Sequence, residues 1–491
     1  MKKTSPRRAS QQTPIGPPLI AILTTLTILL FVAILLLVIQ GYRFNRFDGK
    51  LEQGGLLQYD SRPNGADVYV DSARLANKTA NKITVSAGKH TIRMTKAGYN
   101  DWTKEVTVKP GTILWLNYTR MIPQTKKIDT IATASDVASA AVSTNQKYIA
   151  FKDDQTTPTL NLATIDSDTP KIEKITYTAD SYTTPADPKN QAFAIQTWDD
   201  DNRYVLVRHT YDTDKSEWLV VDTHGGQATL NVTTSIGIAA DHAEFALGNS
   251  RVLYALTSAG DIRRLDLNAR TISAPIVTNV AEFSQYDRST LAYVTKIDES
   301  TKKRTAGYIT NGASKSRALK TYADLGDTSL HLRIGRYFNQ TYVAVAYGET
   351  LDITTGDLPS SDSESTSALT PVASLTIPGG ADTLAFSPGA ERFVYAETTD
   401  SISVYDLELD MLDTTKVDNA NGRAIQWVDR EHFVTTTNDL AIYDFDGTNR
   451  QKLASSSVAL PVVISPNNKY LFTFTKDDRG VYLQRIKLTV D

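Results

Sequence analysis

The sequence contains no cysteine among its 491 residues. Disulfide bonds, thiolate zinc sites, iron–sulfur clusters and cysteine nucleophiles are therefore excluded. Histidine is also scarce, with six residues, and no two of them stand at a spacing typical of metal ligands. H-E-x-x-H, G-x-S-x-G, P-loop and G-x-G-x-x-G motifs are absent as well. We therefore predict no catalytic residue, no metal site and no cofactor.

An excess of positive charge is also lacking, because 52 Lys and Arg face 55 Asp and Glu. Four of the basic residues lie in the first 40 positions, which hold no acidic residue: Lys2, Lys3, Arg7 and Arg8. Taking these four from 52 leaves 48 basic against 55 acidic residues, a balance of −7 for the remainder. A mildly acidic body is not typical of nucleic-acid binding, so we expect no nucleic-acid partner.

One long apolar run is present near the N-terminus. Leu19–Ile39 holds 21 residues without a charge, and its only polar members are Thr24, Thr25 and Thr27. A helix of this length spans about 31 Å, close to the hydrocarbon thickness of a bilayer. A signal peptide has a shorter apolar region and a small-residue cleavage site, which Leu35–Tyr42 does not offer. We predict an uncleaved transmembrane helix over residues 19–40.

The charges around this helix favour a cytoplasmic N-terminus. Four basic residues precede the helix, and three follow it closely: Arg43, Arg46 and Lys50. The positive-inside margin is thus one side chain plus the α-amino group. Residues 1–18 are rich in Pro, Ser and Gln and indicate a short cytoplasmic tail, and residues 41–53 indicate a stalk. We expect a single-pass protein of the cell membrane whose C-terminal domains are extracytoplasmic.

Short alternating strands begin at Gly54. Asn64-Gly65 supplies the positive-φ positions of a tight turn, and Ala66–Asp71 alternates with a period of two. The other predicted strands are Leu56–Asp60, Ile83–Val85, His90–Met94, Glu105–Val108 and Ile113–Tyr118. These segments predict a small β-domain over residues 54–123.

This segment resembles the PEGA domain family. The residues that carry the resemblance are Ser61-x-Pro63-x-Gly65-Ala66-x-Val68-Tyr69-Val70-Asp71, then Ala87-Gly88-Lys89-His90, then Gly98-Tyr99. The Pro-Glu-Gly-Ala motif of the family reads Pro63-Asn64-Gly65-Ala66 here. The resemblance implies an extracytoplasmic module of a surface or membrane protein, without established catalytic residues. Asp71-Ser72-Ala73 and Lys82-Ile83 replace the family's Gly and Thr-Pro, so we expect that hairpin to differ.

Aromatic residues of the small domain have two interpretations. Packing in the core or at the rim is the favoured one for Tyr69, Tyr99, Trp102 and Trp115. The alternative is an exposed platform of Tyr99 and Trp102, because aromatic faces suit sugar rings. Tyr99 and Trp102 are therefore the candidate ligand-binding residues. Turn positions account for Gly65, Gly88, Gly98 and Gly111.

A repeat fills the remaining residues, 124–491. Each unit reads as a turn, an apolar strand, a polar gap and a strand that often ends in Asp. The anchor residues of the apolar strands are Tyr148, Tyr204, Val252, Leu291, Tyr342, Phe393, Phe433 and Tyr470, with a mean spacing of 46. This period, with about four short strands per unit, predicts a β-propeller. We count eight blades, with seven as the alternative.

Two features of the repeat are specific. Ser-Pro followed after three or four residues by Tyr/Phe-Leu/Val-Phe/Tyr, as in Ser387–Tyr395 and Ser465–Phe472, resembles the WD40-like repeats of TolB-type propellers. The Asp residues that end strands can bond the following turn, and they are Asp166, Asp222, Asp266, Asp406 and Asp444. We expect the first strand, Lys126–Ile131, to complete the last blade and so close the ring.

Other motifs favour turns or loops over chemistry. Ser300-x-x-Lys303 lies in a charged hairpin, and Ser360–Ser367 is a low-complexity loop. Asp199–Asp201 and Asp444–Asn449 offer oxygen ligands for calcium, but neither has the distal acidic ligand of a loop site.

The sequence thus predicts an all-β protein, a small PEGA-like domain plus a β-propeller, preceded by one transmembrane helix. The leading function is a membrane-anchored recognition or scaffold protein whose propeller binds protein or envelope polysaccharide. One alternative is a propeller enzyme acting on glycans with two carboxylates in the central channel. Another is a subunit of an envelope protein complex.

Overall fold

A computed structural model describes residues 17–39, 42–44, 51–323, 325–326, 328–363, 369–417, 425–437, 439–455 and 458–490. The chain forms two compact units, Met1–Gln124 and Thr125–Asp491, and each is described by itself. Residues 1–16 of the predicted cytoplasmic tail, residues 41 and 45–50 of the predicted stalk, and residues 364–367 of the Ser-rich loop lie outside the described residues, and residues 17 and 18 belong to the first helix.

The apolar run forms helix α1 (Pro17–Ile39). Its segment Ala21–Ile39 is long and apolar enough to cross a membrane, and none of that segment is buried. The threonine hydroxyls bond back to the helix: Thr24 and Thr25 donate to the Ala21 carbonyl (2.9 and 2.8 Å), and Thr27 donates to the Leu23 carbonyl (2.8 Å). The helix backbone therefore supplies acceptors for these hydroxyls.

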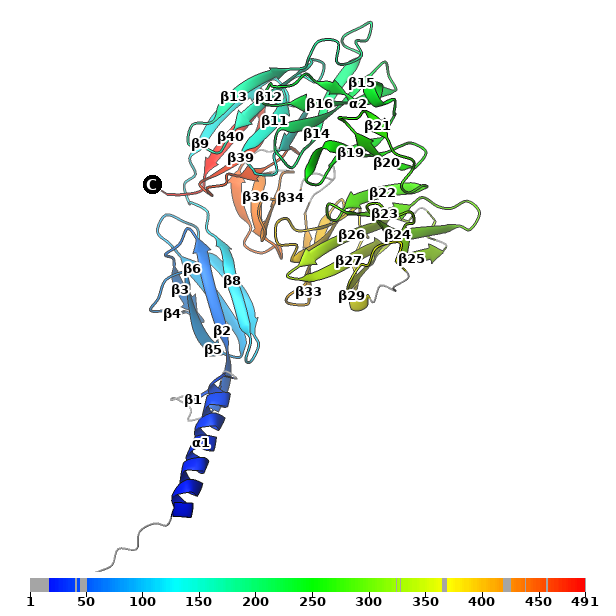
Figure 1. Cartoon of the computed structure of the whole chain (residues 1–491). Helices are drawn as coiled ribbons and strands as arrows, with labels where there is room; N and C mark the ends of the chain where they lie inside the picture. Colours follow the sequence, from blue (N-terminus) through cyan, green and yellow to red (C-terminus); the bar gives the residue numbers. More distant parts are fainter. Residues whose placement is uncertain are drawn as a thin grey trace, which may run out of the picture. The chain divides into compact units, whose positions relative to one another are not determined.

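The first unit contains two four-stranded sheets (Figure 1). One holds β1 (Tyr42–Phe44), β2 (Leu51–Arg62), β5 (Asn81–Ser86) and β8 (Ile113–Arg120). The other holds β4 (Ala73–Arg74), β3 (Asp67–Val70), β6 (Gly88–Thr95) and β7 (Trp102–Val108). In the first sheet, β2 lies between β5, to which it is antiparallel, and β8, to which it is parallel. The predicted strands of the small domain are therefore confirmed.

The turn before β3 forms as the sequence indicates. Gly65 has φ +81°, in the left-handed region that favours glycine. The Thr79 hydroxyl accepts the backbone N–H groups of Gly65 (3.0 Å) and Ala66 (2.9 Å) and fixes the turn from outside. The hairpin after Asp71 is short, because β4 pairs with β3 over two residues only.

The second unit contains eight four-stranded antiparallel sheets within the described residues. The first strands are β10 (Ser139–Val142), β14 (Gln191–Trp198), β18 (His242–Ala246), β22 (Val280–Gln285), β26 (Leu330–Tyr337), β30 (Thr383–Phe386), β34 (Ile425–Trp427) and β38 (Val463–Ile464). The second strands are β11 (Tyr148–Lys152), β15 (Tyr204–Tyr211), β19 (Asn249–Leu256), β23 (Thr290–Thr295), β27 (Gln340–Tyr347), β31 (Phe393–Glu397), β35 (His432–Thr435) and β39 (Tyr470–Asp477). Each anchor residue of the predicted repeat lies in one of these second strands.

The remaining strands complete the sheets. The third strands are β12 (Thr159–Thr164), β16 (Lys215–Asp222), β20 (Ile262–Asp266), β24 (Lys303–Thr310), β28 (Thr350–Thr355), β32 (Ser401–Asp406), β36 (Leu440–Asp444) and β40 (Gly480–Lys487). The fourth strands are β13 (Lys171–Thr176), β17 (Leu230–Asn231), β21 (Thr271–Ile272), β25 (Arg317–Ala323), β29 (Thr370–Thr376), β33 (Met411–Lys416), β37 (Gln451–Ala454) and β9 (Ile128–Ala134). A single-turn helix, α2 (Val232–Ile236), follows β17.

The eighth sheet joins the two ends of the unit. Strand β9 is the first strand of this unit but pairs with β40, its last strand, and this pairing confirms the predicted closure (Figure 1). The Arg485 guanidinium donates to the Asp129 carboxylate (2.7 Å) across the two strands. The second unit is therefore a β-propeller whose first and last strands share one sheet.

The order of strands sets what faces the centre. First strands of neighbouring sheets contact each other, as β10 contacts β14 and β26 contacts β30. Fourth strands such as β13, β29 and β33 are mostly exposed. First strands thus surround the centre, and fourth strands form the outer rim. Apolar clusters fill the space between successive sheets, such as the cluster of Phe193 with Leu160, Leu162 and Leu219.

Candidate functional site

Tyr99 and Trp102, the predicted ligand-binding residues, lie in the core of the first unit. Trp102 is 0 % exposed and Tyr99 is 4 % exposed. The Trp102 ring packs edge-on against Tyr118, with 6.0 Å between ring centroids. A ring without an exposed face cannot stack on a sugar. The prediction of an exposed platform at these two residues is therefore wrong, and the packing interpretation describes them.

A different aromatic residue lies on an open sheet face. On β8, Leu116 and Tyr118 are buried, whereas Ile113 is 50 % exposed, Trp115 is half-buried and Asn117 is exposed. Trp115, for which packing in the core or at the rim was expected, is half-buried, and the alternation of the strand places it on the outer face of the sheet.

Neighbouring strands extend this outer face. Trp115 pairs in register with Gln58 of β2, and Gln58 pairs with Lys82 of β5. The next row holds Ile113, Leu56 and Thr84. Paired residues of adjacent strands point to the same side of a sheet. The outer face therefore presents one indole among amide, ammonium and apolar groups.

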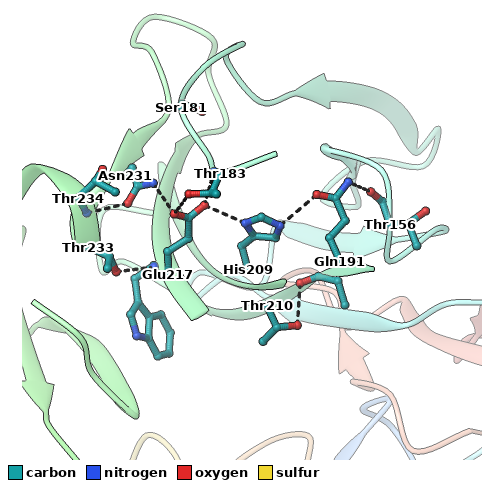
Figure 2. Close-up of polar contacts among 12 residues, drawn as sticks. Thr156, Ser181, Thr183, Gln191, His209, Thr210, Glu217, Asn231, Thr233 and Thr234 are labelled. Carbon is teal, nitrogen blue, oxygen red and sulfur yellow. Dashed lines mark hydrogen bonds and ion pairs between the residues drawn. The ribbon is translucent and has the colours of Figure 1, made fainter. Parts of the chain in front are cut away.

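A buried polar network lies in the second sheet of the propeller (Figure 2). His209 of β15 and Glu217 of β16 are both 0 % exposed, and His209 Nδ1 lies 2.8 Å from Glu217 Oε1. Glu217 also accepts hydrogen bonds from Thr183 N (2.7 Å), Thr183 Oγ1 (3.0 Å) and Asn231 Nδ2 (2.8 Å). Burial opposes ionisation, but these hydrogen bonds outweigh it and hold the pKa of Glu217 below its usual value.

The hydrogen bonds of this network occupy both ring nitrogens of His209. Gln191 donates its amide nitrogen to the Thr156 carbonyl (2.9 Å), so its amide oxygen faces His209 Nε2 (3.2 Å). Nε2 thus faces an amide oxygen, and Nδ1 faces the carboxylate of Glu217. The His209 ring also stacks on Phe193 with 4.0 Å between centroids.

Because every donor and acceptor of this dyad has a partner, the network has no position open to a substrate. The network stabilises the fold instead: Thr183 belongs to the connection between β13 and β14, and its hydrogen bonds to Glu217 attach that connection to β16. Sequence reasoning missed this network, because neither His209 nor Glu217 belongs to a motif.

The centre of the propeller carries a second charged cluster. Glu282 of β22 meets His331 Nδ1 (2.7 Å) and Arg333 Nη1 (2.5 Å) of β26. Burial opposes ionisation of Glu282, but the hydrogen bond from His331 and the charge of Arg333 outweigh it and lower the pKa of Glu282. A glycan hydrolase of the predicted alternative needs a carboxylic acid with a raised pKa. Glu282, in contrast, is suited to remain ionised and to bind cations.

Asp429, Glu431 and His432, at the β34–β35 turn, form a candidate metal-binding group. One ligand atom from each lies within 4.8 Å of the others. However, His432 Nδ1 lies 2.8 Å from Asp429 Oδ1, and Nε2 lies 3.5 Å from Asp444 Oδ1. Burial opposes the charged form, but the two carboxylates outweigh it and raise the pKa of His432 to about 9. Carboxylates thus face both ring nitrogens of His432, and the group is arranged as an ion-pair cluster.

The position of His432 within the repeat explains why it forms ion pairs. A basic residue also precedes the anchor residue in other sheets, and it pairs with the Asp that ends the third strand. Arg203 pairs with Asp222 (2.8 Å), and Arg392 pairs with Asp406 (2.6 Å). His432 precedes the anchor Phe433 in the same way and thus replaces the arginine of the repeat.

His432 gives a prediction about pH. Its pKa is raised to about 9 on folding, so the folded state binds more protons than the unfolded state between the two pKa values. The stability it contributes is full below about pH 6.5 and is lost as pH rises through about 9, a change of about 3 kcal/mol. Urea unfolding at a series of pH values should show this slope for the native chain and a flatter curve for His432→Gln. His242→Gln, at an imidazole whose side chain is 54 % exposed, is the control and should keep the slope.

The acidic segment Asp199–Asp201 connects neighbouring sheets. Asp200 accepts the N–H of Gly248 (2.6 Å), and Asp201 accepts the hydroxyl of Ser250 (2.6 Å), both from the next sheet. Asp199 accepts the backbone N–H groups of Arg203 and Tyr204 (2.8 Å each). These bonds favour the turn interpretation over calcium binding.

The acidic side chains of the other predicted turns also accept hydrogen bonds from nearby groups of the chain. Asp446 accepts the N–H and hydroxyl of Thr448 within its own turn. Strand-ending Asp residues bond the following backbone, as Asp406 does with Glu408 N (2.9 Å). Ser300 donates to Asp298 (2.6 Å), as expected for a charged hairpin. In the Ser-rich loop, Asp362 accepts the N–H groups of Ser314 (2.9 Å) and Lys315 (2.8 Å) and holds that end of the loop in place.

Comparison with known proteins supports part of this description. Residues 55–122 match the model of the PEGA domain, which confirms that resemblance. No curated protein sequence matches the chain.

Solved structures with a similar fold are distant. An oligogalacturonate lyase in complex with manganese is 9 % identical, with a TM-score of 0.39 over 60 % of this chain and 88 % of that chain. A prolyl endopeptidase is 11 % identical, with a TM-score of 0.40 over 61 % and 49 %. The β-propeller domain of Cps50 (Swd1) from Myceliophteria thermophila is 10 % identical, with a TM-score of 0.39 over 73 % and 99 %. At these values no activity or ligand is transferred to this chain.

Proposed function

We propose that this chain is a membrane-anchored recognition or scaffold protein of the cell surface, with its β-domains outside the cytoplasm. The observation that supports this most is helix α1, whose segment Ala21–Ile39 is apolar, uncharged and free of buried residues. Such a surface is stable in lipid and costly in water.

The two units divide the work in this proposal. The PEGA-like domain, over residues 54–123, is a spacer or contact module near the wall. The propeller, over residues 124–491 and of the TolB-like type, presents its loops and channel mouth to a protein or an envelope polysaccharide. A closed ring of sheets supports a recognition role, because the sequences of its loops can vary without loss of the apolar core.

The absence of cysteine makes the topology easy to test. Single cysteines at Ser5, Thr107 and Thr301 would be labelled in intact cells with a maleimide reagent that does not cross membranes. We expect labelling at Thr107 and Thr301, both exposed, and at Ser5 only after permeabilisation. The cysteine-free native chain is the control and should stay unlabelled under both conditions.

Two outcomes would contradict the proposal. Labelling of Ser5→Cys in intact cells, with protection of the other two positions, would reverse the orientation. Recovery of the chain from the medium without residues 1–40 would identify the apolar run as a cleaved signal peptide.

A further inference from the structure

The outer face of the sheet formed by β5, β2 and β8 has the chemistry of a binding surface. Trp115 lies on this face, and within the described residues its indole makes no hydrogen bond or ring contact. The side chains of Gln58, Lys82 and Asn117 likewise make no hydrogen bond among the described residues. Four adjacent side chains thus offer an aromatic surface, amide groups and an ammonium to a ligand.

The arrangement suits a saccharide. A partly exposed indole on a sheet face offers a surface to the C–H face of a sugar ring, and neighbouring amides can bond the ring's hydroxyls. Gln58 lies beside Trp115 in the same register row, and Asn117 lies two residues further along β8. The face is also open, because Asn117, Lys82 and Thr84 are exposed.

The charge of the domain specifies the kind of saccharide. Residues 54–123 contain ten Lys and Arg against five Asp and Glu, whereas residues 125–491 contain 35 against 48. The small domain is therefore positive and the propeller negative, by +5 and −13. Lys82 places one of these positive charges in the same row as Trp115. Charge complementarity thus favours an anionic ligand.

We propose that the outer face of β5, β2 and β8, centred on Trp115, binds an acidic polysaccharide built of pyranose rings. Trp115 stacks on a sugar ring, Gln58 and Asn117 bond its hydroxyls, and Lys82 pairs with its acidic group. This inference rests on the proposed extracytoplasmic location and names the ligand class of the small domain. A lipid surface is the competing ligand. A membrane-binding face would be continuously apolar, whereas here the polar side chains of Gln58 and Lys82 lie in the same row as the indole.

The test uses the full-length chain in detergent micelles, with alginate and hyaluronate as acidic polysaccharides, dextran as the neutral one, and vesicles of phosphatidylcholine and phosphatidylglycerol. We expect both acidic polymers to bind. Trp115→Ala should weaken this binding by roughly tenfold or more, because truncation of a central aromatic anchor is among the most costly changes at an interface. Lys82→Ala should weaken it and make it less sensitive to salt. Trp115→Tyr should restore most of it, and Thr107→Ala, on the exposed side of β7, should change nothing.

Each other result overturns the inference. If neither acidic polymer binds at about millimolar concentration, acidic polysaccharides are excluded as the ligand class. If dextran binds as well as the acidic polymers, the charge of Lys82 plays no part in recognition. Binding to vesicles alone, lost in Trp115→Ala, assigns the face to lipid. The cysteine-labelling experiment does not depend on polysaccharide binding. If no acidic polysaccharide binds but Thr107→Cys is labelled in intact cells, this inference is wrong and the proposed function still stands.

Discussion

Glu217→Ala is expected to destabilise the propeller by about 3–5 kcal/mol, because it leaves several buried polar groups without their hydrogen-bond partner, at about 1–3 kcal/mol each. The substitution leaves the His209 ring without the carboxylate that faces its Nδ1, at a position that is 0 % exposed. It also removes the acceptor of Thr183 and Asn231 (Figure 2). Urea unfolding of residues 51–491, followed by tryptophan fluorescence, measures the change.

Limited proteolysis gives an independent measure of the same network. The connection between β13 and β14 should become cleavable in Glu217→Ala, because Thr183 no longer holds it against β16. The control is Glu299→Ala, whose carboxylate is 88 % exposed and pairs with Lys302. That change should stay within about 0.5 kcal/mol of the native chain. A loss below about 1 kcal/mol in Glu217→Ala would show that the network does not stabilise the fold.

Trp102→Ala is expected to destabilise the small domain by about 3–5 kcal/mol, since it removes a large side chain from a packed core. The indole is 0 % exposed, and it contacts Tyr118 edge-on. Scanning calorimetry of residues 51–491 should show the transition of the small domain at a lower temperature, and the propeller transition should remain in place.

The paired variant is Trp115→Ala. Its indole lies half-buried on the outer sheet face, so we expect a loss of less than about 1 kcal/mol. The two tryptophans thus have opposite expected effects: Trp102 supports folding, and Trp115 supports binding. Equal destabilisation by both substitutions would contradict the assignment of Trp115 to an open face.

Much of the fold was predictable because it depends on local chemistry. The charge-free run Leu19–Ile39 predicted α1, and hydroxyls of its threonines bond within the helix. Turn residues such as Asn64-Gly65 marked strand ends, and the anchor residues predicted the sheets. Closure by β9 was also predictable, because a strand before the first complete repeat has an open edge to pair with at the end of the last one.

The site was harder to predict, because alternation defines two faces of a strand but not which one is covered. On β8, one face carries Leu114, Leu116 and Tyr118, and the other carries Ile113 and Trp115; both contain apolar residues. Only the packing of a second layer decided that Leu116 is buried and Trp115 open. The same packing buried Tyr99 and Trp102, which the sequence could not distinguish from an exposed pair.

The sequence by itself therefore determined the apolar helix, the strands with their period, and the order of the two units. The tertiary structure decided which aromatic residue meets solvent and which distant polar groups meet in the core, such as His209 with Gln191. The reason is physical: turns and periodicity depend on neighbours in the chain, whereas burial and pairing depend on residues brought together from separate strands.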